Sequence, residues 1–75
     1  MPKRYTAREV LSALRKAGFV DVSQRGSHVK MRGFRGGRLL TVIVPMHREI
    51  AVGTFGSILR QADMGQNEFE SYLKK

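Results

Sequence analysis

A short segment of strict alternation carries the residues most able to do chemistry. In His28-Val29-Lys30-Met31-Arg32, one imidazole and two cations occupy every second position. Successive side chains of a β-strand point to opposite faces, so a strand here would place His28, Lys30 and Arg32 together. An imidazole exchanges a proton near neutral pH, and neighbouring cations can stabilise developing negative charge. This combination suits cleavage of RNA, in which the ribose 2′-OH attacks the adjacent phosphorus without needing a metal or an enzyme nucleophile.

The same polar residues also have ordinary interpretations. An exposed strand histidine is more often inert than catalytic. His47, in Pro45-Met46-His47-Arg48, could position RNA, stabilise its own loop or act as the complementary acid. Ser27 has no Asp or Glu nearby to complete a Ser-His-Asp triad, which favours a turn or hydrogen-bonding role. Phe34, flanked by glycines and arginines, could stack on a base or pack back on the sheet.

Positive charge is concentrated in the middle of the chain. The 75 residues include 14 Lys and Arg against six Asp and Glu, a net charge of +8. No carboxylate lies between Asp21 and Glu49, whereas basic residues are frequent there. This pattern favours a polyanionic partner, although the same charge can serve solubility alone. We predict RNA contacts at Arg25, Ser27, Lys30, Arg32, Arg35, Arg38 and His47.

The composition argues against several other classes of protein. Cysteine is absent, which removes disulfides and thiolate chemistry, and two histidines with six scattered carboxylates supply a closed metal site poorly. No glycine-rich segment precedes a helix in a phosphate-cradling pattern, so we expect no cofactor. No apolar run approaches the ~20 residues of a membrane helix. We therefore expect residues 1–75 to form a single cytoplasmic domain without membrane contact.

Amphipathic segments predict two helices and a short helical tail. Thr6-Ala7-Arg8-Glu9 is a capping box that starts the first helix, and Gly18 ends it. Thr54 can cap a second helix, which Gly65 ends, and Asn67 to Glu70 could cap the tail. The apolar positions expected to pack are Ala7, Val10, Leu11, Leu14 and Ala17, then Phe55, Ile58, Leu59 and Ala62, then Phe69, Tyr72 and Leu73.

Three strands are predicted between the helices. They are Phe19 to Arg25, His28 to Arg32 and Leu39 to Val44. Gly26-Ser27 supplies a turn, and segment 33–38 suits a mobile hairpin loop. Because these links are too short for parallel crossovers, we expect an α+β fold of α-β-β-β-α order with a three-stranded antiparallel sheet. Both helices should cover one face, leaving His28, Lys30 and Arg32 on the other.

Four segments of the chain resemble the HicA toxin family, also called YcfA-like. Each is weak alone, but all four occur in the family's order, and the likeness extends from about Thr6 to Tyr72. The segments are Val10 to Phe19, Gly26-Ser27-His28, Val44-Pro45-Met46-His47 and Gly53 to Ala62.

The resemblance implies both a fold and an activity. It implies a fold like that of double-stranded-RNA-binding domains, and a metal-independent endoribonuclease toxin that cleaves mRNA and is neutralised by a HicB-type antitoxin. The family's catalytic histidine falls on His28, whereas the Pro-x-His histidine falls on His47 without a catalytic role. Asp63 stands where the family usually has glycine, which puts the end of the second helix in question. The alternatives are a non-catalytic RNA-binding module and a protein-interaction domain that docks on an acidic partner.

Overall fold

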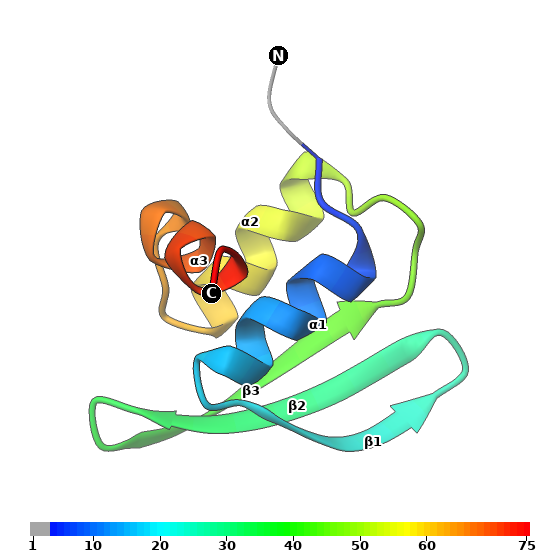
Figure 1. The fold of residues 1–75 in the computed structure, drawn as a ribbon. Helices are drawn as coiled ribbons and strands as arrows, with labels where there is room; N and C mark the ends of the chain where they lie inside the picture. Colours follow the sequence, from blue (N-terminus) through cyan, green and yellow to red (C-terminus); the bar gives the residue numbers. More distant parts are fainter. Residues whose placement is uncertain (1–3) are drawn as a thin grey trace.

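The computed structural model describes residues 4–75, which form three helices and one three-stranded antiparallel sheet. All three helices lie on one side of the sheet, so its other face is open (Figure 1). The strands are joined in sequence order, β1-β2-β3, which confirms the predicted α+β fold. The elements are α1 (Ala7–Lys16), β1 (Val20–Arg25), β2 (His28–Arg35), β3 (Arg38–Pro45), α2 (Val52–Gln61) and α3 (Gln66–Leu73).

Helix α1 begins and ends as the sequence predicts. The Glu9 amide donates to Thr6 Oγ1 at 3.1 Å, while the Thr6 amide donates to Glu9 Oε1 at 2.9 Å, which completes the capping box. Gly18 follows the helix with φ of +105°, a conformation that side chains with a Cβ rarely adopt. This turn brings Phe19 back beneath α1, where it is buried.

The core lies between the helices and the inner face of the sheet. Alternate residues of β2 and β3 are buried there, and the apolar stripes of the helices pack on them. His28, Lys30 and Arg32 occupy the intervening positions of β2 and therefore face away from the helices, as expected. The buried strand residues are Val29, Met31, Val42 and Val44.

A β-bulge makes β1 differ from the predicted simple alternation. The register with β2 shifts between Asp21 and Ser23, and Val22 has no partner in β2. The residues before and after Val22 therefore do not follow one continuous alternation of faces. Asp21 opposite Met31 faces the helices, whereas Ser23 and Arg25 share the open face with Lys30 and His28. The extra residue thus places the carboxylate of Asp21 and the cation of Arg25 on opposite faces.

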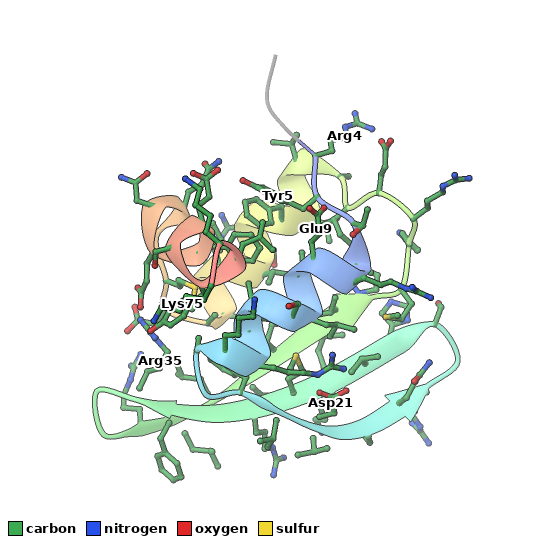
Figure 2. The ribbon with its side chains drawn as sticks, in the orientation of Figure 1. Arg4, Tyr5, Glu9, Asp21, Arg35 and Lys75 are labelled. Atoms are coloured by element: carbon green, nitrogen blue, oxygen red, sulfur yellow. The ribbon has the colours of Figure 1, made fainter. Side chains whose placement is uncertain are left out.

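Asp21 joins edge strand β1 to α1. Its two carboxylate oxygens accept hydrogen bonds from Arg15 Nε at 3.0 Å and Nη2 at 2.8 Å, and it lies on the helix side of the sheet in Figure 2. The hydrogen bond from Arg15 is the main reason that the pKa of Asp21 lies below its ordinary value. The stability gained from this pair is therefore present at neutral pH and is lost as the pH falls through the lowered pKa.

We expect Asp21→Asn to reduce the free energy of unfolding at pH 7 by no more than about 1 kcal/mol, because the pair is exposed. The difference from wild type should shrink below about pH 4, where protonated Asp21 resembles asparagine. Urea unfolding of both proteins at several pH values measures this. Glu49→Gln, in the longer Arg4–Glu49 pair at 3.7 Å, is the comparison variant. If the difference in free energy of unfolding between wild type and Asp21→Asn did not change with pH, the ionised Asp21 would not be the source of the stabilisation.

The predicted loop over 33–38 is wrong, because both strands continue into this segment. Only Gly36 and Gly37 form the turn, with φ of +58° and +79°, and Arg35 pairs with Arg38 across it. Two consecutive positive φ angles match the twist of a tight hairpin. Gly33 lies within β2 and packs closely against Phe19, since a Cβ at this position would come 2.9 Å from Phe19 Cδ2.

The later helices begin earlier than their predicted caps. Helix α2 starts at Val52 after Ala51, so Thr54 lies inside it, and α3 starts at Gln66 after Gly65, so Asn67 is no cap. Asp63 adopts a φ of +53° beyond the end of α2, in the conformation that glycine would take. Aspartate tolerates this region better than most residues, which explains how the helix ends there without glycine.

Candidate functional site

A shallow hollow surrounds His28 on the open face of the sheet. Its volume is about 170 Å³, and all three strands contribute to its lining. The strand register explains the grouping, because Arg25 lies opposite His28, while Ser23 and Ile43 lie on either side of Lys30. His28 and Arg25 are exposed and Lys30 is half-buried. One imidazole and two cations therefore meet where a solvent-borne ligand can reach them.

The open face is electropositive because no carboxylate of the chain lies on it. All six carboxylates belong to residues 4–75, and each is engaged on the helix side or in a loop. Within these residues, Arg25, Lys30 and Arg32 form no ion pair. The carboxylate partners are Glu9 with Thr6, Asp21 with Arg15, Glu49 with Arg4, Asp63 with Arg38, Glu68 with Arg35 and Glu70 with Tyr5.

Ser27 holds the turn that presents His28. It lies with Gly26, whose φ is +55°, between β1 and β2. Its carbonyl oxygen accepts a hydrogen bond from the Met46 amide at 2.6 Å, which joins this turn to the end of β3. The Ser27 side chain is exposed but does not line the hollow around His28.

The structure separates Arg35 and Arg38 from the other predicted phosphate-binding residues. Arg35 Nη2 lies 2.7 Å from Glu68 Oε2, between the hairpin and α3 (Figure 2). Its hydrogen bond to Glu68 is the main reason that the pKa of Arg35 is raised. Arg38 reaches Asp63 Oδ2 at 4.0 Å. Arg35 therefore joins the hairpin to α3, and neither arginine lines the hollow around His28.

His47 lines a different hollow from His28. This second hollow has a volume of about 370 Å³ and lies between the start of α1 and the loop after β3. The Ala7 amide donates to the His47 carbonyl at 3.3 Å, so the loop supports the start of α1. Sequence reasoning did not connect this loop with α1. The lining residues are Thr6, Ala7, Arg8, Met46, His47 and Arg48.

Two residues at the hollow of His28 were missed as site residues in the sequence analysis. Ser23 enters the hollow only because of the bulge in β1, and Ile43 enters through its register with Lys30. Within residues 4–75, no three His, Asp or Glu side chains gather as metal ligands. The same residues include no helix with the length and apolar character of a membrane span.

Comparison with known families identifies the chain. Residues 7–64 match the family described as "HicA toxin of bacterial toxin-antitoxin". No curated protein matches this chain. The family match covers α1, all three strands and α2, and so includes every residue that lines the hollow around His28. The chain therefore belongs to the HicA toxin family of bacterial toxin–antitoxin systems.

Proposed function

We propose that this protein is a metal-independent endoribonuclease toxin that cleaves mRNA, with His28 as the general acid or base. The observation that carries the proposal is the hollow in which His28 meets Arg25 and Lys30, on a sheet face without carboxylates. Membership in a toxin family supports it. A single-stranded mRNA segment would bind across the open face. We further propose that the chain acts as a single domain in the cytoplasm.

Two proton transfers and a nucleophilic displacement make up the proposed reaction. A base removes the proton of the ribose 2′-OH, whose oxygen then forms a bond to the adjacent phosphorus. The bond from phosphorus to the 5′-oxygen breaks, and an acid protonates that oxygen. The products are a 2′,3′-cyclic phosphate and a 5′-OH end. His28 performs one of the two transfers, typically worth 10² to 10⁴ in rate, and Lys30 stabilises the added charge on the phosphoryl oxygens.

Incubation of purified protein with single-stranded RNA in EDTA tests the proposal. We expect cleavage to persist, because the reaction needs no metal, and the upstream product to end in a 2′,3′-cyclic phosphate. A DNA strand of the same sequence should stay intact, because it lacks the attacking hydroxyl. Intact RNA held in a stable complex would contradict cleavage and indicate a non-catalytic RNA-binding module.

Lys30→Ala should weaken binding of single-stranded RNA more at low salt than at high salt. Lys30 lines the hollow and has no carboxylate partner within residues 4–75. Each cation that neutralises a phosphate adds about 0.7 to the slope of log affinity against log salt for single strands. We expect Lys30→Ala to reduce that slope by about this amount. Fluorescence anisotropy with a 2′-O-methyl strand, which cannot be cleaved, measures it.

The matched control for this experiment is Arg60→Ala. Arg60 is exposed on α2, so its removal changes the net charge equally but away from the open face. The slope should stay at the wild-type value. Equal changes in the two variants would mean that total charge, and not the site around His28, controls binding.

Membership in a toxin–antitoxin family implies an antitoxin partner, which we propose to be of the HicB type. The positive open face suits a partner that presents carboxylates to it. Such a partner would prevent cleavage by covering His28. This inhibition would require no change in the conformation of the toxin.

A further inference from the structure

Phe34 is an exposed aromatic side chain on the same face as His28. It is 74% exposed, more than any other large apolar side chain within residues 4–75. It follows Lys30 and Arg32 at every second position of β2, while Met31 and Gly33 face the helices. Its cross-strand partner Leu39 is also exposed, at 53%. The open face therefore has an apolar end beside its basic end.

The local structure fixes Phe34 in this exposed position. The register between β2 and β3 is continuous from His28 to the turn at Gly36 and Gly37. The preceding Gly33 packs directly on Phe19, and the following Arg35 is held by Glu68. Phe34 cannot turn toward the helices without breaking this arrangement. The strand thus fixes the face from which the Phe34 side chain projects, and an aromatic ring presented to solvent in this way offers a contact to a flat apolar ligand.

The positive charge near Phe34 indicates which kind of ligand would bind there. Arg32 lies two positions away on the same face, and no carboxylate of residues 4–75 lies there. A second copy of this chain would bring two positive faces together, which opposes association through this surface. A single-stranded nucleic acid offers both chemistries, since its phosphates suit Arg32 and its bases suit the Phe34 ring.

We propose that Phe34, supported by Leu39, forms a base-stacking subsite for the single-stranded RNA that binds across the open face. Phe34 lies six positions from His28 along β2, or about 20 Å at the usual rise of a strand. The stacked base is therefore several nucleotides from the linkage that is cleaved at His28. This inference relies on the proposed function for its choice of RNA.

Tryptophan fluorescence offers a direct test, because the chain contains no tryptophan. Phe34→Trp would place one reporter at the subsite, and Val52→Trp would place one at a site 46% exposed on α2. A short 2′-O-methyl strand should quench the first reporter and leave the second unchanged. Phe34→Ala should weaken binding of that strand about five- to hundredfold, the usual range for one stacked base.

Strands carrying one abasic site each locate the stacked base. At one position, removal of the base should lower affinity for wild type and have no further effect on Phe34→Ala. Quenching that persists at every abasic position, or unchanged affinity in Phe34→Ala, would overturn the subsite. A wild-type dimer that Phe34→Ala converts to monomer, with RNA binding unaltered, would also overturn it.

The 2′-O-methyl strands of this test, with or without an abasic site, cannot be cleaved because they lack a free 2′-OH. The subsite is therefore tested separately from the reaction. Stacking at Phe34 in a protein that leaves natural RNA intact would contradict the proposed cleavage and support the subsite. Cleavage of natural RNA without stacking at Phe34 would contradict the subsite alone.

Discussion

His28→Ala should lower the rate of RNA cleavage by at least 10²-fold while leaving the protein folded, because general acid or base catalysis contributes about 10² to 10⁴. His28 is exposed at the start of β2, and no core contact is lost with its side chain. The rate is measured on a short RNA under single-turnover conditions. Urea unfolding of the same preparation shows whether the fold is retained.

His47→Ala is the matched comparison for this prediction. The same side chain is removed, but His47 lines the separate hollow beside α1. We expect a loss of about tenfold or less, the size of one positioning contact. In cells, induction of wild type should arrest growth and degrade transcripts, and His28→Ala should do neither. A folded His28→Ala protein that cleaves at the wild-type rate would remove His28 from the mechanism.

The sequence predicts the position of His28 well because alternation is a local property. Five residues from His28 to Arg32 determine which side chains share a face, and a buried Met31 places Lys30 on the opposite face. The capping box at Thr6 is equally local and is formed as predicted. The family resemblance at the residues around His28 is confirmed by the match over 7–64.

The cation group is less predictable because ion pairing depends on distant residues. Arg35 and Arg38 belong to the same basic run as Arg32, yet Glu68 and Asp63 engage them from the helical layer. Counting charges along the chain cannot reveal these pairs. The bulge near Val22 is a second limit, since one extra residue reverses the face of every later side chain in β1 and brings Ser23 to the site.

The loop prediction failed because glycine has more than one use. Gly36 and Gly37 adopt positive φ in a turn, as a glycine-rich loop suggests, but Gly33 serves close packing against Phe19 within a strand. Phe34 thereby becomes part of a rigid strand. This difference matters for function, because a residue on an ordered strand loses less backbone entropy on binding a base than a residue in a mobile loop.

Phe69→Ala should be the most destabilising of these substitutions, lowering the free energy of unfolding by about 3–5 kcal/mol. Phe69 of α3 is fully buried, with its ring centre 5.1 Å from that of Tyr5 and 5.0 Å from that of Phe55. Domains of this kind are commonly stable by only 5–15 kcal/mol, so little stability would remain. Urea unfolding followed by circular dichroism measures the change.

Phe34→Ala provides the control, because it is the same chemical change at an exposed position and should alter stability by about 0.5 kcal/mol or less. A small effect of Phe69→Ala would show that α3 is dispensable for folding. We expect the opposite, because Tyr5 and α3 flank the family match at 7–64 on either side and pack on each other. The Tyr5 hydroxyl also donates to Glu70, so Tyr5 is joined to α3 by a hydrogen bond as well as by ring packing, and both contribute to the core that covers the inner face of the sheet.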